Sequence, residues 1–475
     1  MKVWQTRRVT QILQASLIGD PEVEVNGCVL DSRLVQGGEM FMAFSGQKVD
    51  GFSYIAKAWE RGAVLAVAEA SDTRGFSEVF TVPEGKALIL VDSVAGALQK
   101  LAQVRRQELG AKVIGITGSN GKTTTKDMIA TVLSQNYKVH KNIENQNNEL
   151  GLPLTILNAP GDTEMLVLEM GMRGLGEIKT LCEIAQPDTG VITNIGTTHM
   201  ELLGTQEAIA QAKWELVDNL PTTGMAVLNT EDYYSHIKVQ KDQHSVRYYG
   251  LQGKWQVPDV QGQNLKPLGT LGTSFEVFYA QERAKVELPL PGEHNVLDAL
   301  AALTVGTVWG IPLEVGAHGL AKLELSKMRL EALAGIYKSL LISDVYNANP
   351  ISMQASLKIL KERAAGKPTL AILGEMYELG STSQAGHQEV GVAVARLGIS
   401  KLITVGKMAE GIAEGAENEG FPVQSLETCA TREEAIMRAS KALKELEHGS
   451  WVLIKGSRGM KMEEITAKLM NYNNA

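Results

Sequence analysis

The segment VIGITGSNGKTTTK, residues 113–126, limits the possible folds more than any other part of the chain. Apolar, largely β-branched residues lead into a glycine-rich turn, and Lys122 and Thr123 then begin a helical pattern. In such a unit the loop amides and the helix N-terminus bind phosphate, and the strand belongs to a parallel sheet. An ordinary glycine turn before a buried helix is the alternative. We therefore predict a nucleotide-binding loop made by Thr117, Gly118, Ser119, Asn120, Gly121, Lys122, Thr123 and Thr124.

The rest of the chain repeats this order of apolar strand, polar turn and helix. The segments EMLVLEMG (164–171) and DTGVITNIG (188–196) read as further strands of the sheet that the loop opens. Another set begins near residue 326 and includes SLLISDVYNANP (339–350) and SWVLIKGS (450–457). With 475 residues and about 150 residues per domain as a guide, we predict an α/β fold of three domains. These are a small N-terminal α/β module (1–109), a central parallel-sheet domain carrying the phosphate loop (110–325) and a C-terminal Rossmann-like domain (326–475).

Charge and apolar patterning argue against several classes of protein. Lys and Arg number 46 against 54 Asp and Glu, a net charge of -8, whereas a general nucleic-acid binder carries a basic surface. The longest uncharged run, residues 299–313, contains Gly and Pro and falls short of the roughly 18 apolar residues of a membrane span. The N-terminal residues lack a signal-peptide core, and Cys28, Cys182 and Cys429 are isolated, which suits reduced thiols. We expect a cytoplasmic protein without nucleic-acid binding or membrane insertion.

The loop is best written T-G-x-x-G-K-T, residues 117–123, and in this form it resembles the ATP-dependent Mur ligase superfamily. Further motifs follow in the family's order over nearly the whole chain. They include LVLEMG (166–171), N-x-N-N-x-x-G-x-P (145–153), GEHNVLDALAA (292–302) and VLIKGSRG (452–459). The resemblance implies a three-domain ligase whose N-terminal domain binds a UDP-sugar, whose central domain binds ATP and whose C-terminal domain closes over the site.

The resemblance also implies a metal site. Lys122, His199 and Lys213 are the expected catalytic residues, and two Mg²⁺ ions are expected at Thr123, Glu169, His199 and Lys213. In the family the matching lysine is carbamylated, which replaces a cation that would repel the metals by an anion. On the residues alone, Glu169 could be a solubilising residue at a strand end, His199 a hydrogen-bonded loop histidine and Lys213 a solvated helix lysine.

The remaining site residues follow from the same resemblance. Asn295, Arg329 and Asp344 are expected to contact the nucleotide, and the substrate residues are expected to be Ser32, Arg33, Asn145, Asn147, Asn148, Asn347, Asn349, Lys455 and Arg458. Two positions depart from the common pattern of the family: Phe52 stands where many members have His, and Ser343 stands where many have Asp. Phe52 affects the expected UDP-sugar site. Ser343 leaves the expected role of Asp344 unchanged, because Asp344 still follows it.

The Y-N-A-N-P element at residues 346–350, together with D-S-R at residues 31–33, indicates which reaction to expect. The resemblance implies ATP-dependent joining of D-alanyl-D-alanine to a UDP-N-acetylmuramoyl-tripeptide through an acyl phosphate, a step of peptidoglycan precursor synthesis. Another ligase of the superfamily, such as a folylpolyglutamate synthase, or a non-enzymatic ATP-binding module are the alternatives. The first should lack both motifs, and the second should release no ADP in response to a dipeptide.

Overall fold

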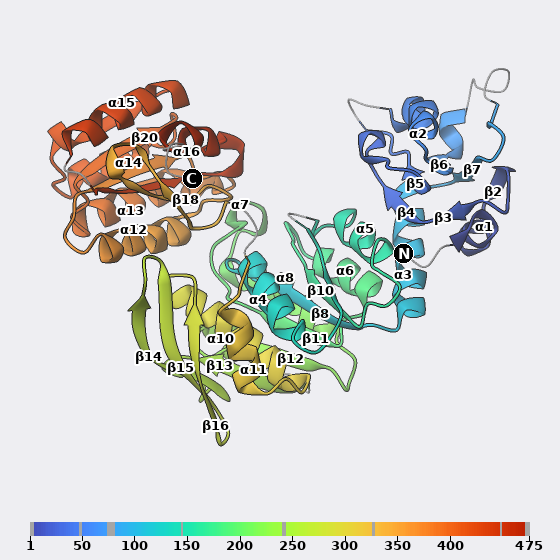
Figure 1. Cartoon of the computed structure of the whole chain (residues 1–475), viewed down its shortest axis with the longest axis horizontal. Helices are drawn as coiled ribbons and strands as arrows, with labels where there is room; N and C mark the ends of the chain where they lie inside the picture. Colours follow the sequence, from blue (N-terminus) through green and yellow to red (C-terminus); the bar gives the residue numbers. More distant parts are fainter. Residues whose placement is uncertain are drawn as a thin grey trace.

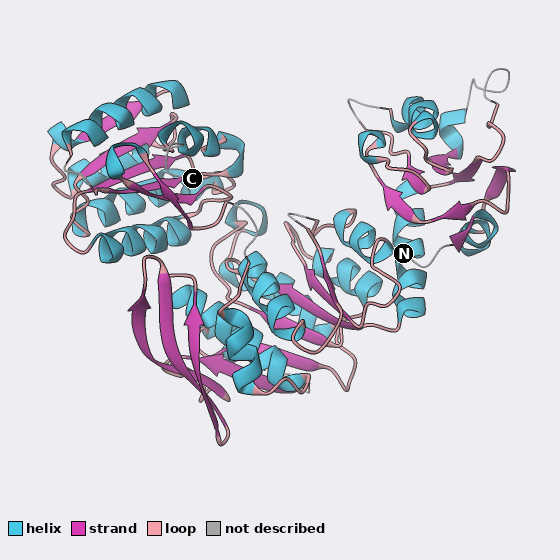
Figure 2. Cartoon of the chain, viewed as in Figure 1, coloured by secondary structure: helices cyan, strands magenta, loops and turns pink. Residues whose placement is uncertain are grey.

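The computed structural model describes residues 4–46, 50–73, 81–143, 146–239, 244–324, 328–446 and 449–470. Within these residues the chain forms three α/β bodies, drawn from blue through green and yellow to red in Figure 1, around sheets of five, nine and six strands. Each of the three bodies contains both helices and strands (Figure 2). The described part of the chain has no helix that combines the length and apolarity required to cross a bilayer.

The N-terminal body is built on a five-stranded sheet with the order β2-β7-β6-β5-β4. Its elements are β1 (Trp4–Gln5), α1 (Thr6–Leu13), β2 (Ser16–Gly19), β3 (Glu24–Val25), β4 (Gly27–Val29), β5 (Glu39–Met42), α2 (Ile55–Glu60), β6 (Leu65–Glu69), β7 (Ala87–Val91) and α3 (Val94–Leu109). Ser93 begins α3 by accepting a hydrogen bond from Gly96 N, and Gly110 ends it in the left-handed region at φ 65°.

The central body carries a nine-stranded sheet with the order β16-β15-β14-β13-β12-β11-β8-β10-β9. Its elements are β8 (Lys112–Thr117), α4 (Lys122–Leu133), β9 (Val139–Lys141), α5 (Gly151–Leu157), β10 (Met165–Glu169), α6 (Glu177–Ala185), β11 (Thr189–Ile192), α7 (Met200–Leu203), α8 (Gln206–Asp218), β12 (Met225–Asn229), α9 (Tyr233–Val239), β13 (Ser245–Gly250), β14 (Val260–Leu268), β15 (Gly272–Tyr279), β16 (Glu282–Leu288), α10 (Glu293–Val308) and α11 (Leu313–Leu320). One apolar core lies on the α5, α6 and α8 side, and another on the α4, α10 and α11 side.

The central sheet is parallel over most of its strands, as predicted, and it also has an antiparallel edge that the sequence analysis did not identify. Strands β9 to β14 are parallel neighbours, but β14, β15 and β16 pair antiparallel. Along β16 buried and exposed residues alternate, which is the pattern of a sheet with one wet face. This period of two is present in the sequence and marks the antiparallel edge. The uncharged run of residues 299–313 lies largely in α10, whose residues are mostly buried.

The C-terminal body has a six-stranded sheet with the order β17-β18-β22-β19-β20-β21. Its elements are β17 (Glu331–Ala334), β18 (Leu340–Asp344), α12 (Pro350–Ala364), β19 (Thr369–Gly374), α13 (Ser383–Arg396), β20 (Lys401–Val405), α14 (Glu410–Asn418), β21 (Leu426–Cys429), α15 (Arg432–Glu445), β22 (Trp451–Lys455) and α16 (Glu463–Leu469). All pairings except β17 with β18 are parallel. Ligands of such open sheets bind beyond the carboxyl ends of the strands.

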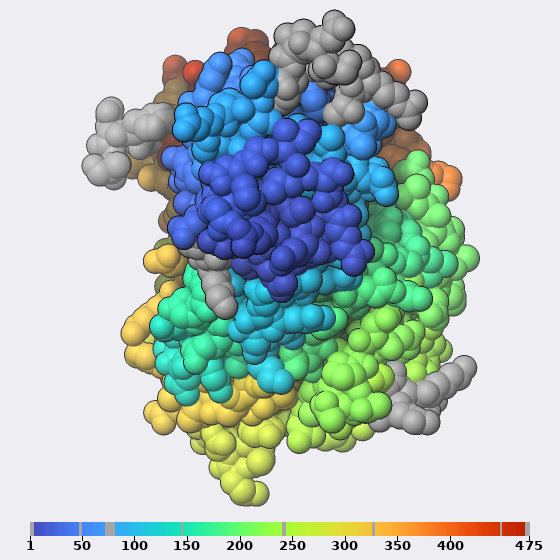
Figure 3. Space-filling view, turned by 90° about the vertical axis from the view of Figure 1, so that its right-hand side faces the viewer, coloured from blue at the N-terminus to red at the C-terminus, as the bar shows by residue number. Residues whose placement is uncertain are grey.

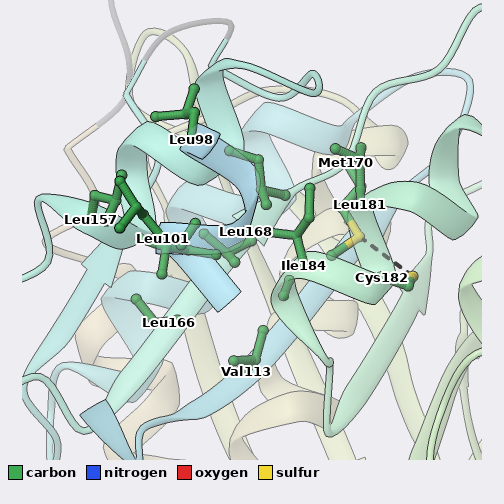
Figure 4. Close-up of a cluster of buried hydrophobic side chains, with 14 of the residues drawn as sticks. Leu98, Leu101, Val113, Leu157, Leu166, Leu168, Met170, Leu181, Cys182 and Ile184 are labelled. Carbon is green, nitrogen blue, oxygen red and sulfur yellow. Dashed lines mark hydrogen bonds between the residues drawn. The ribbon is translucent and has the colours of Figure 1, made fainter. Parts of the chain in front are cut away.

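The N-terminal and central bodies are joined by a shared apolar core. A continuous apolar core runs from the N-terminal sheet through α3 into the central body, and Figure 4 shows Leu98 and Leu101 of α3 in the same cluster as Leu157, Leu166 and Leu181. In Figure 3 the blue N-terminal surface adjoins the cyan central surface. The helix α3 therefore contributes to both bodies, and the domain boundary at residues 109 and 110 stays a proposal.

The C-terminal body contacts the central one through few groups. Leu271, in the turn between β14 and β15, is buried in the C-terminal core, and Arg363 Nη2 donates to Gly272 O at 2.6 Å. The proposed boundary between these domains, at residues 325 and 326, lies outside the described residues.

Candidate active site

The predicted phosphate loop turns sharply between β8 and α4. Gly118 has φ 155° and Gly121, the N-cap of α4, has φ 81°. A Cβ atom on Gly118 would lie 1.8 Å from Thr193 Oγ1, and one on Gly121 would lie 2.5 Å from Asp298 Oδ1. Both positions thus require glycine, because of the backbone angle and the close neighbours.

The segment after β11 holds this loop. Thr193 Oγ1 donates to Asn120 O at 2.6 Å, and Asn194 bonds Asn120 twice, accepting from its amide at 3.1 Å and donating to its carbonyl at 3.0 Å. Gly196 N donates to Ser119 Oγ at 2.8 Å. The loop is therefore fixed by side-chain bonds that need no ligand, which lowers the cost of ordering it when phosphate binds.

One polar cavity of about 580 Å³ lies in front of the loop, which we call the phosphate cavity. It is bounded by the central and C-terminal bodies. The structure brings together there most of the residues that the sequence predicts: Ser119, Asn120, Gly121, Lys122, Thr123, Thr124, Asn147, Asn148, Glu169, His199, Lys213, Asn295, Arg329, Asp344, Asn347, Asn349 and Lys455.

A hydrogen-bonded chain links the loop to the end of β10. Thr123 Oγ1 donates to Glu169 Oε2 at 2.7 Å, and Asn147 Nδ2 donates to Glu169 Oε1 at 2.8 Å. Arg329 Nη2 donates to Thr123 Oγ1 at 2.9 Å. Glu169 is 3% exposed, so the alternative of a solubilising carboxylate at a strand end is wrong.

Three nitrogen groups face the same cavity. Lys122 Nζ donates to Gly118 O at 2.7 Å, across the loop that it follows. Lys213, on α8, is 1% exposed, which makes the alternative of a solvated helix lysine wrong. Burial lowers the pKa of Lys213 well below its ordinary value, and the Lys122 ammonium lowers it further. Burial likewise lowers the pKa of Lys122.

His199 precedes α7 in the left-handed region, with φ 68°. Its Nδ1 atom is buried without a hydrogen-bond partner, although Glu378 Oε2 lies 3.5 Å away. Burial lowers the pKa of His199 to about 4, with Lys213, Lys122 and Arg173 adding to the effect. The imidazole is therefore neutral near pH 7, the form in which histidine can donate a lone pair to a metal.

The C-terminal body contributes a second set of polar groups. The Lys455 ammonium is paired with Asp344 and donates to Asn347 O at 3.0 Å. Burial alone would raise the pKa of Asp344, but Lys455 outweighs it and the pKa is lowered. The Arg329 guanidinium lies 4.2 Å from the ring centroid of Tyr346. Asn349, which caps α12, donates from Nδ2 to Asn120 Oδ1 at 2.6 Å, so this body touches the phosphate loop.

Some predicted residues lie elsewhere or have local partners. Ser32 and Arg33 form a short turn after β4 in the N-terminal body, where Arg33 is paired with Asp31. Asn148 Oδ1 accepts from Gly151 N at 2.9 Å at the start of α5, and Asn295 Nδ2 donates to Pro291 O at 2.6 Å.

Three other predicted residues do not line the phosphate cavity. Thr117 and Gly118 form the first part of the loop, and Arg458 lines a neighbouring cavity. Asn145 lies outside the described residues.

Several cavity residues were not singled out from the sequence. Asp298 follows Asn295 by one helical turn of α10, and Thr125 Oγ1 donates to its Oδ1 at 3.0 Å. Glu378 comes from the loop after β19, and Arg173 lies 3.7 Å from it. An aspartate inside the apolar segment GEHNVLDALAA was the available signal for Asp298.

The donor set fits Mg²⁺. Thr123 Oγ1 and Glu169 Oε2 are oxygen donors of the kind that Mg²⁺ prefers. The buried Nδ1 of His199, which has no hydrogen-bond partner, adds a nitrogen donor, a more usual ligand of zinc and the transition metals. Among the described residues no group of three or more His, Cys, Asp or Glu could hold a metal ion. Mg²⁺ typically takes one or two protein carboxylates and completes its shell with water and substrate phosphates, so a preformed cluster is not required.

A phosphate loop that faces a Rossmann-like body across one polar cavity is the arrangement of a nucleotide-dependent group-transfer enzyme. Family comparisons agree with this class. The chain matches the Mur ligase middle domain over residues 116–306, the Mur ligase glutamate ligase domain over 328–458, and the Mur ligase family catalytic domain over 24–106.

Individual proteins give a narrower result. The UDP-N-acetylmuramoyl-tripeptide–D-alanyl-D-alanine ligase of Bacillus subtilis is 36% identical, with 98% of each chain covered. A crystal structure of MurF from Acinetobacter baumannii superposes with a TM-score of 0.87 at 29% identity and 99% coverage of both chains. MurF from Thermotoga maritima in complex with ADP gives a TM-score of 0.77 at 28% identity, covering 94% of this chain and 97% of that one. The chain therefore belongs to the Mur ligase family, among its UDP-N-acetylmuramoyl-tripeptide–D-alanyl-D-alanine ligases. It is an ATP-dependent ligase, as the sequence predicts.

Proposed function

We propose that the chain joins D-alanyl-D-alanine to the terminal carboxylate of UDP-N-acetylmuramoyl-tripeptide, with ATP as the energy source. The phosphate cavity carries this proposal, because it combines a phosphate loop, a threonine–glutamate oxygen pair and the amide groups of the Y-N-A-N-P turn. The family relation supports it. We also propose that the reaction takes place in the cytoplasm, where ATP and UDP-linked precursors are available.

The first step activates a carboxylate, which is a poor acyl donor. A carboxylate oxygen of the tripeptide attacks the γ-phosphorus of ATP, the bond to the β,γ-bridging oxygen breaks, and ADP leaves with the bonding electrons. Lys122 is the group proposed to bind the outer phosphates, and the bonded loop of residues 117–124 orients them. Asn295, Arg329 and Asp344 are proposed to bind and enclose the nucleotide.

The second step forms the amide. The dipeptide nitrogen, as a neutral amine, attacks the acyl carbon, and the C–N bond forms while phosphate leaves with the electrons of the C–O bond. Between ammonium and amide the nitrogen loses two protons. Because water would compete for the acyl phosphate, the cavity has to exclude it, and the C-terminal body supplies one wall. Asn147 and Asn148 are proposed to hold the acyl substrate, and Asn145 is proposed with them.

Two Mg²⁺ ions are proposed to bind at Thr123, Glu169 and His199, where they would offset the negative charge of the phosphates. A carbamate on Lys213 would complete this set. The amine must be neutral to react with carbon dioxide, and burial favours the neutral form of Lys213 by lowering its pKa. No carboxylate within the described residues is paired with this lysine, so a carbamate would bring negative charge that the site otherwise lacks near α8.

The N-terminal body is proposed to bind the uridine diphosphate part of the substrate at Ser32 and Arg33. The Arg33 side chain is exposed, and its guanidinium is paired with Asp31, which orients it. The apolar core shared by the N-terminal and central bodies would keep this site at a fixed distance from the phosphate cavity.

A coupled assay of phosphate release tests the proposed function. Release should require ATP, UDP-N-acetylmuramoyl-tripeptide and D-alanyl-D-alanine together. Reactions that omit one component, or that supply single amino acids, should give only the background rate. If glutamate supports the same rate without a muramoyl substrate, the assignment is wrong and a folylpolyglutamate-type ligase takes its place. Binding of ATP without dipeptide-dependent ADP release would indicate a binding module.

A further inference from the structure

The side chain of Asn142 continues the bonding of β10 beyond the end of its neighbour β9. The register of these parallel strands ends with Lys141 opposite Val167, whereas β8 accompanies β10 as far as Glu169 on the other edge. Glu169 N donates to Asn142 Oδ1 at 3.0 Å, and Asn142 Nδ2 donates to Glu169 O at 3.0 Å. One side-chain amide thus takes the place of a further strand residue and bonds both backbone groups of the last residue of β10.

Asn142 is itself fixed by other parts of the central body. It is fully buried, and its Nδ2 atom also donates to Gln146 O at 2.9 Å. Its backbone carbonyl accepts a hydrogen bond from Lys126 Nζ at 2.9 Å. Lys126 is 1% exposed and lies on α4, about one helical turn after Thr123. Asn142 therefore connects the end of β10 with the helix that carries the Thr123 hydroxyl.

The pair of bonds to Glu169 requires an amide side chain. Asparagine carries a donor and an acceptor on separate atoms of one planar group, so it can bond the N–H and the C=O of the same residue. An ionised aspartate has no donor, and a hydroxyl has both functions on a single atom. Alanine at position 142 would remove both partners from buried backbone groups, which costs stability.

The direction of the Glu169 carboxylate depends on this backbone bonding. Glu169 Oε2 accepts from Thr123 Oγ1, and both residues belong to the proposed Mg²⁺ site. A displaced strand end would move the carboxylate away from the hydroxyl. We propose that Asn142 is a positioning residue, which holds Glu169 so that its carboxylate and Thr123 Oγ1 can bind one Mg²⁺ ion together. This inference rests on the proposed function and deepens it by adding a residue that acts on the metal only through Glu169.

Nucleotide binding in the absence of peptide substrates tests this role apart from catalysis. The dissociation constant of a fluorescent ATP analogue is measured in Mg²⁺ and in EDTA, and the ratio of the two values gives the enhancement of binding by the metal. Asn142→Ala should lower this enhancement by about 10-fold or more, as loss of a group that orients a metal ligand does elsewhere. The dissociation constant in EDTA should stay close to that of the wild type.

Asn158→Ala is the matched control. The Asn158 side chain makes the same pair of bonds, accepting from Cys28 N at 2.9 Å and donating to Cys28 O at 2.9 Å, but Asn158 does not line the phosphate cavity. Urea unfolding should show a loss of stability in both variants, whereas only Asn142→Ala should lose the enhancement by Mg²⁺. Binding that weakens equally in Mg²⁺ and in EDTA would show that Asn142 only maintains the fold, and would overturn the positioning role.

A double-mutant cycle tests whether Asn142 acts through Glu169. Glu169→Gln should lower the enhancement by itself, and adding Asn142→Ala to it should then have little further effect. Additive losses, or wild-type enhancement in Asn142→Ala, would overturn the inference. If Glu169→Gln keeps the wild-type enhancement, the proposed metal site fails and the inference fails with it. If the cycle behaves as expected but wild type gives no dipeptide-dependent phosphate release, the positioning role stands and the proposed ligase reaction is wrong.

Discussion

We predict that the pH dependence of the free energy of unfolding reports the protonation of the buried Asp298 carboxyl group. The side chain is 6% exposed in α10, accepts a hydrogen bond from Thr125 and packs against the loop at Gly121. Burial raises its pKa to about 8, against smaller opposing effects of Thr125 and Arg329. Near neutral pH the group is therefore largely protonated in the folded protein and ionised in the unfolded chain.

The sign and size of the effect follow from this difference. Between the ordinary value of 3.8 and about 8, the folded state holds a proton that the unfolded state lacks, so stability falls as pH rises. Each unit corresponds to about 1.4 kcal/mol. From pH 5 to pH 8 the wild type should therefore lose about 4 kcal/mol through this group. Asp298→Asn keeps the acceptor for Thr125 without the ionisation, so its advantage over wild type should grow by the same amount.

Urea unfolding of both proteins at pH 5, 6.5 and 8 measures this difference. Asp162→Asn is the control, because Asp162 is an exposed residue of the central body paired with exposed Lys138, and its removal should leave the pH profile unchanged. ATP binding should also weaken as pH rises, since an ionised Asp298 would repel ATP. The KM for ATP should rise above pH 8 in wild type and less so in Asp298→Asn. A stability difference that stays constant from pH 5 to pH 8 would refute a buried, protonated carboxyl.

Four other predictions concern the loop and the buried lysine. Lys122→Ala should lower turnover by at least about 10²-fold, as loss of a preorganised charge does elsewhere; near-normal phosphate release would contradict the phosphate-loop assignment. Lys213→Met should be folded and no less stable than wild type, because a buried amine without a carboxylate partner is replaced by an apolar chain, yet nearly inactive. In Lys213→Ala acetate should restore part of the activity and chloride should not; retention of more than about half the wild-type rate in bicarbonate-free buffer would disprove the carbamate, since loss of a required group costs far more. Gly118→Ala should abolish activity through its clash with Thr193, whereas Gly176→Ala, also at positive φ but in open space, should lose only stability; equal activity in the two variants would show that the clash is relieved.

Local sequence patterns predicted much of the fold. The strands β8, β10 and β11 are short apolar runs that need no distant partner to be recognised, and the glycine spacing of residues 118–121 fixes the turn between β8 and α4. The three-domain α/β fold was confirmed. The antiparallel edge was missed although β16 alternates with a period of two, because its polar face weakens the apolar signal that identified the other strands.

The site residues also divide into those that a local motif predicts and those that depend on tertiary contacts. Lys122 and Thr123 were predictable since they adjoin a local motif, and Glu169 ends a recognisable strand. The burial of Lys213 was not predictable, because it depends on packing against parts of the chain that are distant in sequence. Glu378 was missed for a different reason: its relevance depends on a left-handed backbone and on the approach of α7 from another body. Such properties arise from tertiary contacts, which a pattern along one chain does not encode.

The unequal joints between the bodies have a consequence for the reaction. The N-terminal and central bodies share one apolar core, so separating them would expose a large buried surface. The C-terminal body is linked through individual side chains, among them Leu271 and Arg363, the Asn349–Asn120 and Arg329–Thr123 hydrogen bonds and the contact of Glu378 with Arg173, and such contacts can be exchanged at smaller cost than a shared core. The phosphate loop belongs to the first unit, and Glu378 and Arg458 belong to the second. In the proposed reaction the phosphate loop and the C-terminal wall of the cavity are therefore carried by different bodies, so the reaction depends on how these two bodies are held at their joint.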